Sequence, residues 1–343
     1  MIFPPEWSRH EATWISWPHH EPDWPGKLAS IPWVYAEIVR VLHQHERVEI
    51  LCHDEAVREA ATDYLAAHGV TSNFRLHLVP SDRGWLRDSA PTGVIHDGRV
   101  KLVNWRFNGW AKYDNCARDQ RLGSAIADIT GLDRIEPLRP DDSGRVVLEG
   151  GAIETNGDGT LLVTEECLLS PIQVRNPGLT RAGYERMFHD SLGIQRTIWL
   201  GEGCVGDDTH GHIDDVARFT SPTTIVLAFE ADPADDENHR RSVDNMERLQ
   251  LAGGASGALR IVKLPCPHPV MMNGERLPAS YANFYIANGV VLVPTFNDSN
   301  DRVALNILAA LFPDRQIVGI HSVDLVWGLG TLHCLTQQQP AAT

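Results

Sequence analysis

The sequence predicts an α/β protein, a five-bladed pseudo-symmetric α/β propeller formed by a single domain of five repeats over residues 1–343. One unit recurs five times along the chain: an amphipathic helix, a short apolar strand, a loop and a hairpin. Asp-Gly and Asn-Gly steps, which favour hairpin turns because these residues tolerate positive φ, lie in three expected hairpins. No stretch between the units has the composition of a linker between domains. An ordinary α/β sandwich would give the same order of elements and remains the alternative.

Helices are expected where apolar residues recur three or four positions apart and capping residues lie at the ends. Gly131 is expected to close one helix, Thr180 to cap the next, and Asp232 to cap a helix whose first turn accommodates Pro233. One helix, over residues 55–68, is extra to the repeat. In chain order the expected helices cover residues 33–45, 55–68, 120–131, 180–193, the stretch after 232–233, and 300–311.

Short apolar runs predict one strand after each repeat helix, at residues 48–53, 134–138, 196–200, 259–264 and 316–320. Hairpins are expected at residues 92–106, 152–164, 213–229 and 281–296. A last hairpin, at residues 330–337, has no partner strand beside it in the sequence. Residues 13–17, which read Thr-Trp-Ile-Ser-Trp, could supply that partner and close the ring.

The charge balance is acidic, with 45 Asp and Glu against 30 Lys and Arg and a formal net charge of −15. This balance argues against nucleic acid or a membrane surface as partner and suits a cationic small molecule, although an acidic surface also simply keeps a protein in solution. No apolar run could span a bilayer, and residues 1–9 show no export signal. Six scattered cysteines without C-x-x-C pairs predict a reducing cytoplasm. A homo-oligomer is compatible with the sequence.

Chemically active side chains stand where the expected hairpins begin. In a radial repeat, equivalent positions converge on the axis, so these side chains should share one central pocket. A thiol, an imidazole and carboxylates there would provide a nucleophile, a proton shuttle and partners for a cation. In chain order they are Asp88, Glu149, His212 with Asp214, Asn283, and Cys334.

Each candidate also has a structural interpretation. Cys334 could be a small buried apolar residue, but it follows the glycine-rich stretch 328–330, which would let the backbone approach a ligand. The other five cysteines are interpreted as structural. Glu149, before two glycines, could belong to a plain turn, and Asp88 could pair with Arg87 at the surface.

The polar run at residues 207–215 has two other interpretations. It could be a solvated loop, or it could form a zinc hydrolase centre from His210, His212 and Asp214. Such enzymes place a further histidine where this chain has Asp215. A metal centre would also leave Cys334 and Glu149 without a role. No metal is therefore expected.

Six ordered blocks resemble the agmatine deiminase and bacterial-type peptidylarginine deiminase family, within the guanidino-group-modifying superfamily of five-bladed α/β propellers (the pentein fold). The similarity extends over nearly the whole chain. The blocks are WLRDSAP (85–91), NWRFNGWAK (104–112), LEGGAIETNGDGTLLVTEECLL (148–169), DDTHGHIDDVARF (207–219), ASYANFYIANGVVLVPTFND (279–298) and GLGTLHCLTQQQP (328–340).

The resemblance implies a cytoplasmic hydrolase of polyamine biosynthesis that needs no cofactor. It makes Cys334 the nucleophile and His212 the general acid and base. Asp88 and Asp214 match the carboxylates that hold the guanidinium group, and Glu149 matches the acid that supports His212. Trp85 would lie against the aliphatic part of the substrate. Two departures, Ala90 in place of Gly and the shortened glycine run at 328–330, put the substrate rather than the chemistry in doubt.

Agmatine, deiminated to N-carbamoylputrescine and ammonia through a covalent thiouronium, is the first expectation for the substrate, with Asp208 as a partner for its far amine. Arginine, peptidyl-arginine or another guanidine is the alternative, and the α-carboxylate of arginine would need a cation such as Arg87, Arg106 or Arg218. A propeller that binds without catalysis is a third hypothesis. Residues 256–278 are a candidate for a loop over the pocket, with an ordered connection as the alternative.

Overall fold

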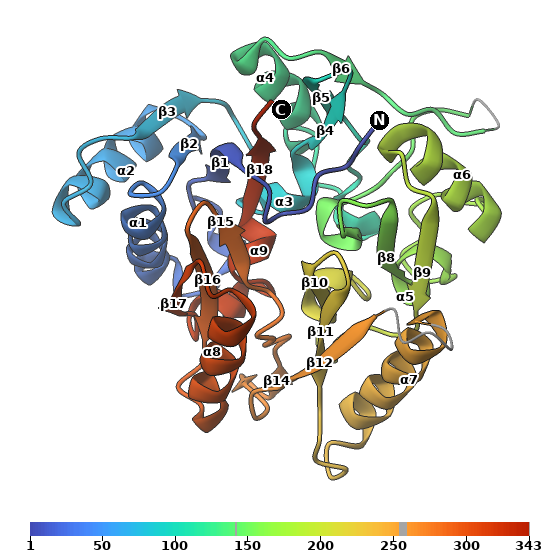
Figure 1. Cartoon of the computed structure of the whole chain (residues 1–343). Coiled ribbons are helices and arrows are strands. Elements are labelled where there is room, and N and C mark those ends of the chain that lie inside the picture. Colours follow the sequence, from blue (N-terminus) through green and yellow to red (C-terminus); the bar gives the residue numbers. More distant parts are fainter. Residues whose placement is uncertain (141–142, 254–258, 343) are drawn as a thin grey trace.

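The computed structural model describes residues 1–140, 143–253 and 259–342 (Figure 1). Within these residues, the strands form five mixed sheets of three or four strands and one separate two-stranded hairpin. The sheets are arranged around the middle of the molecule, and the longer helices lie outside them (Figure 1). The predicted α/β class is therefore confirmed.

Four sheets share one pattern. An antiparallel pair of strands is followed, after a helix, by a third strand that runs parallel to the second. This order matches the predicted repeat of hairpin, helix and strand. The four sheets are β4 (Thr92–His96), β5 (Arg99–Val103) and β6 (Arg134–Ile135); β7 (Glu154–Thr155), β8 (Thr160–Thr164) and β9 (Arg196–Leu200); β10 (Ala217–Ser221), β11 (Thr224–Phe229) and β12 (Arg260–Pro265); and β15 (Tyr285–Ala287), β16 (Val290–Thr295) and β17 (Gln316–His321).

The remaining larger sheet joins segments that lie far apart in the chain. Its order is β18 (Thr336–Pro340), β1 (His10–Ser16), β2 (Arg47–Cys52) and β3 (Phe74–Leu78). β18 pairs antiparallel with β1, with Trp14 opposite Gln337, and β1 pairs parallel with β2. The predicted pairing of the N-terminal strand with the segment that follows Cys334 is confirmed.

The middle strands are almost continuously apolar because both of their faces are covered. In β16, the first five residues are buried. The helices that cover the sheets are α1 (Ile31–Leu42), α2 (Glu55–Ala67), α4 (Leu122–Thr130), α6 (Arg181–Leu192), α7 (Asp236–Gly253) and α8 (Ser299–Leu311), and α5 (Glu165–Leu169) is a shorter helix after β8.

The predicted helix ends are confirmed at two positions. The Thr180 side chain accepts a hydrogen bond from the Gly183 N–H, and Gly131 ends α4 with a left-handed φ of 69°. The cap predicted at Asp232 is wrong, because its carboxylate accepts from Ala234 N–H in a turn that precedes α7. The strand predicted at 134–138 stops at Ile135, since Pro137 has no N–H to continue the ladder.

Short helical turns that precede four of the antiparallel pairs contain Asp88, Asp214 and Cys334, and Glu149 and His212 each stand directly before such a turn. α3 (Leu86–Ser89) precedes β4, the turns Gly150–Ala152 and Ile213–Asp215 precede β7 and β10, and α9 (Leu332–Leu335) precedes β18. α3 contacts both α9 and the turn at Gly150–Ala152. The predicted hairpin at 330–337 is thus a helical turn followed by a strand that pairs with β1. These turns meet near the middle of the molecule (Figure 1).

Part of the predicted loop at 256–278 lies outside the described residues. Its described part, from residue 259 onward, contains β12 and the hairpin of β13 (Met271–Met272) and β14 (Glu275–Arg276). None of the helices in the described ranges combines the length and the apolarity needed to cross a membrane.

Candidate active site

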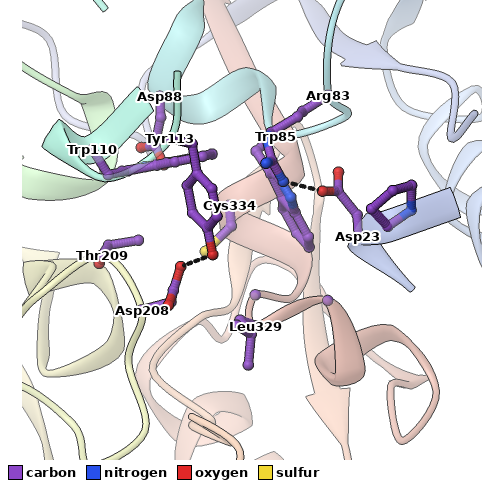
Figure 2. A pocket seen from close by; sticks show the side chains of 13 residues that line it. Asp23, Arg83, Trp85, Asp88, Trp110, Tyr113, Asp208, Thr209, Leu329 and Cys334 are labelled. Atoms are coloured by element: carbon purple, nitrogen blue, oxygen red, sulfur yellow. Dashed lines mark hydrogen bonds and ion pairs between the residues drawn. The ribbon is translucent and has the colours of Figure 1, made fainter. Parts of the chain in front are cut away.

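A cavity of about 490 Å³, partly open to solvent, lies beside α3 and α9 (Figure 2). Its wall combines aromatic rings, carboxylates and the thiol of Cys334, which makes it suited to a ligand with an apolar body and a cationic group. The lining residues are Pro22, Asp23, Arg83, Trp85, Asp88, Trp110, Tyr113, Asp208, Thr209, Gly328, Leu329, Gly330 and Cys334.

The Cys334 thiol is held in a fixed position in α9. Its Sγ accepts a hydrogen bond from Asn283 Nδ2 at 3.1 Å and lies 3.7 Å from Asp214 Oδ2. Asn283 Oδ1 accepts from the backbone N–H of His333 at 3.0 Å, so the same amide orients both the turn and the sulfur. Burial, and then the negative charge of Asp214, raises the pKa of the Cys334 thiol well above its ordinary value. The thiol is therefore neutral before a cation binds.

Three side chains meet over the backbone of Gly151. Asp88 Oδ1 accepts from the Gly151 N–H at 3.0 Å, and Asp88 Oδ2 accepts from Trp110 Nε1 at 2.9 Å. A Cβ at position 151 would lie 2.5 Å from His212 Nδ1, 2.9 Å from Asp88 Oδ1 and 3.1 Å from Asp214 Oδ2. The absence of a side chain at Gly151 thus lets the imidazole and two carboxylates converge.

His212 lies between two carboxylates. Its Nδ1 is 3.8 Å from Asp88 Oδ1, and its Nε2 is 3.7 Å from Glu149 Oε2. Burial disfavours the imidazolium, but the negative charge of Asp88 together with the interactions of Cys167 and Glu149 outweighs burial and raises the pKa of His212 well above its ordinary value. His212 is therefore a charged acid that can donate a proton.

Glu149 is held ionised by Arg175, whose Nε donates to Glu149 Oε1 at 3.1 Å. Burial raises the pKa of Glu149, but the charges of Arg175 and His212 outweigh burial and lower the pKa to about 2. For Asp88 burial dominates and raises the pKa to about 6. The two carboxylates thus differ in how readily they take up a proton.

Several buried polar atoms of this cluster form no hydrogen bond to any of the described residues. Within the described residues, neither ring nitrogen of His212 has a hydrogen-bond partner, and the same holds for Glu149 Oε2 and Asp214 Oδ1. Buried polar groups are ordinarily paired. The unpaired atoms lie among the groups that the sequence predicts to act on substrate.

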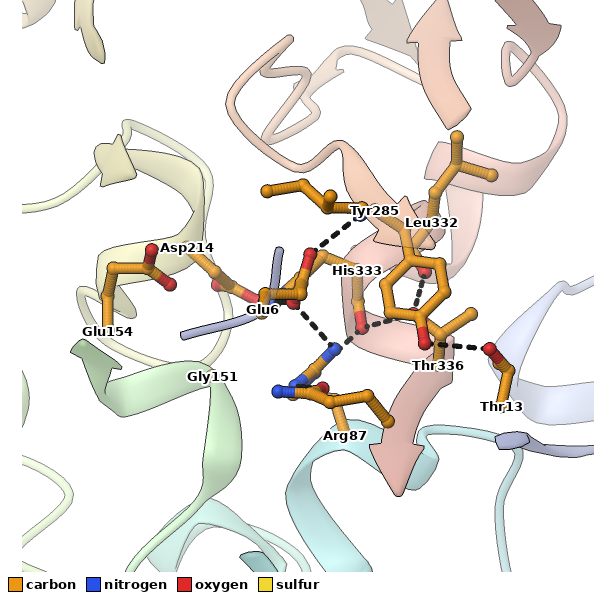
Figure 3. A network of polar contacts seen from close by, with 12 residues as sticks. Glu6, Thr13, Arg87, Gly151, Glu154, Asp214, Tyr285, Leu332, His333 and Thr336 are labelled. Atoms are coloured by element: carbon orange, nitrogen blue, oxygen red, sulfur yellow. Dashed lines mark hydrogen bonds and ion pairs between the residues drawn. The ribbon is translucent and has the colours of Figure 1, made fainter. Parts of the chain in front are cut away.

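A network of buried charges lies behind the site (Figure 3). His333 Nδ1 lies 2.6 Å from Asp214 Oδ2, and His333 Nε2 lies 2.8 Å from Glu6 Oε2. Arg218 donates to Glu6 Oε1 at 2.9 Å, and Arg87 to Glu6 Oε2 at 3.3 Å. His333, the residue next to Cys334, is therefore tied, through Glu6, to two arginines from distant parts of the chain.

The predicted site residues lie close together. Cys334, His212, Asp88, Asp214 and Glu149 form one continuous series of neighbours. Trp85 and Asp208 both line the cavity, so each can contact a ligand.

The cations considered for an arginine carboxylate lie elsewhere. Arg87 does not pair with Asp88 as the structural interpretation proposed, because it bonds to Glu6, Gln338 and the His333 carbonyl. Arg218 is fully buried in the same network, and Arg106 is exposed and does not line the cavity.

Several neighbours of the site escape prediction from the sequence. Arg175 and Glu6 lie in stretches without a recognisable signal, whereas Trp110 lies within one of the six family blocks. Cys167, interpreted as structural, lies with Glu149 and His212 in a group whose ligand-type atoms are all within 4.8 Å of one another. Cys167 also lies within one of these blocks, after Glu165 and Glu166, but nothing in the sequence there distinguishes it from a structural cysteine.

Two buried groups of the described residues could offer metal ligands: Glu149, Cys167 and His212, and Asp214, Asp215 and Cys334. His210 belongs to neither group, because its ring bonds to Ser170 Oγ at 3.0 Å and lies near Glu166. In the part of the chain that the structure describes, the His210, His212 and Asp214 set of the zinc hydrolase alternative therefore does not form a cluster.

Comparison with known proteins links this arrangement to deiminases. The model of the Porphyromonas-type peptidyl-arginine deiminase family matches residues 2–340. The agmatine deiminase of Stutzerimonas stutzeri (strain A1501) is 35% identical, over 98% of this chain and 95% of its own. The structure resembles a cysteine-to-serine variant of the C. jejuni agmatine deiminase with substrate bound (28% identity, TM-score 0.88, 100% and 97% of the two chains). It also resembles the agmatine deiminase of Enterococcus faecalis (28% identity, TM-score 0.89, 99% and 96%).

Proposed function

This chain belongs to the Porphyromonas-type peptidyl-arginine deiminase family, and from that premise we propose that it hydrolyses agmatine to N-carbamoylputrescine and ammonia. The observation that carries the proposal is the Cys334 thiol in a cavity walled by aromatic rings and carboxylates. Agmatine deiminases are hydrolases that act on the C–N bonds of amidines, and two of them share the fold of this chain over nearly its whole length. We interpret the five sheets as blades of a propeller and residues 1–343 as one catalytic domain.

Binding comes first in the proposed mechanism. The planar guanidinium lies between Asp88 and Asp214, whose carboxylate oxygens accept charge-assisted hydrogen bonds from its N–H groups. Asp214 Oδ1 has no other hydrogen-bond partner among the described residues. The carboxylates draw positive charge toward the central carbon and place that carbon beside the sulfur. Trp85 and Trp110 cover the apolar part of the substrate.

The bound cation then activates the nucleophile. In the free protein, burial and then the negative charges around Cys334 raise the pKa of its thiol and keep it protonated. A guanidinium on those carboxylates cancels their charge and lowers the pKa of the thiol, which releases its proton to solvent. The thiolate adds to the guanidinium carbon and forms a tetrahedral adduct.

His212 completes the reaction. Its imidazolium gives a proton to the departing nitrogen, which leaves as ammonia, and an S-alkylthiouronium remains on Cys334. The neutral imidazole then takes a proton from water as the water oxygen attacks the same carbon. Cleavage of the C–S bond releases the ureido product and restores the thiol. Through both steps, Glu149 faces one ring nitrogen of His212 and Asp88 faces the other, so the two carboxylates keep the imidazole in position.

The tail of the substrate favours agmatine over arginine. None of Arg87, Arg106 and Arg218 lines the cavity, so none of them meets an α-carboxylate there, and Arg83, which does line it, is already paired with Asp23. The proposal includes a cytoplasmic place in polyamine biosynthesis, because the product is a carbamoylated diamine and all six cysteines are free, as expected in a reducing compartment. The partner is a small cation; a homo-oligomer is compatible with the proposal.

The test is to incubate the purified protein separately with agmatine, arginine and an arginine-containing peptide, and to measure ammonia and ureido product. We expect release from agmatine that Cys334→Ala abolishes. Cys266→Ala is the matched control, since Cys266 lies away from the cavity lining and should retain activity.

The other outcomes separate the alternatives. Release from arginine or the peptide, and not from agmatine, would replace the substrate and keep the chemistry. Turnover by Cys334→Ala would refute the covalent mechanism. If no guanidine is consumed but agmatine protects Cys334 from alkylation, the protein is a binding module.

A further inference from the structure

Two carboxylates that line the cavity, Asp208 and Asp23, each form an ion pair. Asp208 accepts a hydrogen bond from the Tyr113 hydroxyl at 2.7 Å (Figure 2) and pairs with the ammonium of Lys112. Asp23 pairs with Arg83. Besides Asp88, the cavity wall therefore has two further carboxylates, and each of them already has a cationic partner.

The Tyr113 ring connects the two pairs. The guanidinium of Arg83 lies 4.3 Å from the ring centroid, and the ammonium of Lys112 lies 5.4 Å from it. Cations over an aromatic face are attracted to it. Lys112 contacts Asp208, the carboxylate proposed to bind the far amine of agmatine, both through their ion pair and through the Tyr113 ring. A change at Lys112 therefore acts on that carboxylate.

A tail ammonium can reach Asp208 only in competition with Lys112. The Asp208 side chain is 18% exposed, and the Lys112 side chain is 42% exposed. The lysine can thus move into solvent when displaced, whereas the aspartate stays in the wall. Breaking the ion pair between Lys112 and Asp208 costs part of the binding free energy that the substrate ammonium would otherwise gain from Asp208.

We propose that Lys112 is a specificity-determining residue, which weakens the binding of guanidines with an ammonium tail and makes the cavity more tolerant of guanidines with a carboxylate tail. The inference rests on the proposed deiminase function. Displaced or in place, the Lys112 ammonium lies beside the tail of the substrate, where it repels a cation and attracts an anion. The degree of preference for agmatine is then set by one residue outside the catalytic cluster.

The test compares agmatine with 4-guanidinobutyrate, which has a carboxylate in place of the aminomethyl end. For Lys112→Met we expect KM for agmatine to fall roughly twofold to fivefold, the size of an exposed ion pair, with a smaller change in kcat. The kcat/KM ratio of agmatine to 4-guanidinobutyrate should rise. If the acid is not turned over, its inhibition constant replaces its KM. Lys101→Met, on β5, is the matched control, since its partner Asp133 does not line the cavity, whereas Asp208, the partner of Lys112, does.

A double-mutant cycle assigns the effect to the pair. Asp208→Asn should raise KM for agmatine, and Lys112→Met should have less effect on KM in that background than in the wild type. An unchanged or higher KM in Lys112→Met, or an equal effect in both backgrounds, would overturn the inference while Cys334-dependent turnover still stood. Absence of any Cys334-dependent turnover in the wild type would instead refute the proposed function on which the inference rests.

Discussion

At Gly151, three polar side chains of the site occupy the space that a side chain at this position would need. The imidazole of His212 and the carboxylates of Asp88 and Asp214 all approach its Cα because no side chain separates them. The sequence suggests a close approach here, since two glycines follow Glu149, but it does not say what approaches. The sequence thus predicts which residues gather here, whereas their contacts with Arg175, Glu6 and Cys167 could not be predicted, because these contacts join segments that no local pattern relates.

A methyl group at Gly151 should therefore displace the groups proposed to be catalytic. For Gly151→Ala we expect kcat/KM for agmatine to fall about a hundredfold, as small misplacements of reacting groups do. Steady-state kinetics measures the loss, and circular dichroism checks that the fold persists. Gly253→Ala is the control, since a Cβ there would make only ordinary contacts. Activity near the wild-type level in Gly151→Ala would show that the convergence over this glycine is not needed.

The pKa of Asp88 predicts an acid limb in the pH profile. Burial raises that pKa to about 6 in the free protein, and only the ionised carboxylate can hold a guanidinium. kcat/KM for agmatine should therefore fall as the pH drops through about 6. Asp23 also has a pKa raised to about 6, so Asp23→Asn distinguishes the two groups: the limb should remain in that variant. Its disappearance there would assign the limb to Asp23.

Among the elements, α9 depends on contacts outside its own repeat. It is only a short turn, and Asn283 and the Glu6 network hold its two central residues. Hydrophobic periodicity predicted the long helices and the apolar strands well, because burial of one face dominates their formation. It failed at 330–337, where a hairpin was expected, since a single turn of helix has no periodicity to detect. The short strand at Arg134–Ile135 ends for a local reason, the proline at 137.

Loss of the Glu6 charge should destabilise the whole fold. Glu6→Gln leaves two buried arginines and His333 with less compensation, and breaking such buried ion pairs costs about 3–5 kcal/mol. Urea denaturation at neutral pH measures the loss. Glu11→Gln is the control, because Glu11 is exposed and pairs with Arg47 at the surface.

The effect of Glu6 should also depend on pH in a defined direction. Burial raises its pKa, but Arg218 and His333 outweigh burial and hold it well below the ordinary value of 4.5. The stabilisation is therefore complete above about 4.5 and is lost as the pH falls toward the folded-state pKa. The difference between wild type and Glu6→Gln should shrink in acid. A difference that grows in acid would contradict this assignment of charge.

At the scale of the whole molecule, the pairing of β1 with β18 connects the first strand of the chain with the last. Its register, with Ile15 opposite Thr336, fixes the position of the turn that precedes β18 and carries Cys334. This long-range pairing was expected because one predicted hairpin had no partner in its own part of the sequence. Its exact register was not, since several alignments of two short strands bury similar side chains.

Removal of β18 should abolish activity although every predicted catalytic residue remains. A chain that stops after Leu335 retains Cys334 but loses the strand that holds α9 against β1. We expect no ammonia release from agmatine and a lower melting temperature. A chain that stops after Pro340 keeps the strand, loses the hydrogen bond from Ala341 N–H to the Arg9 carbonyl, and should stay active. Full activity of the shorter chain would show that the turn is stable without β18.

The scattering of the site along the chain also has a consequence during protein synthesis. Arg87 and His333, which flank Asp88 and Cys334, touch in the folded protein but are separated by 246 positions. A ribosome therefore produces Asp88 and Asp214, the carboxylates proposed to bind guanidinium, before it produces Cys334, the proposed nucleophile. Under the proposed mechanism a nascent chain has these acids but lacks Cys334, so chemistry begins only when the segment that carries Cys334 has emerged and β18 has paired with β1. Translation that stops early thus yields chains that are inert toward guanidines, and the order of synthesis itself keeps a reactive centre from forming in an unfinished protein.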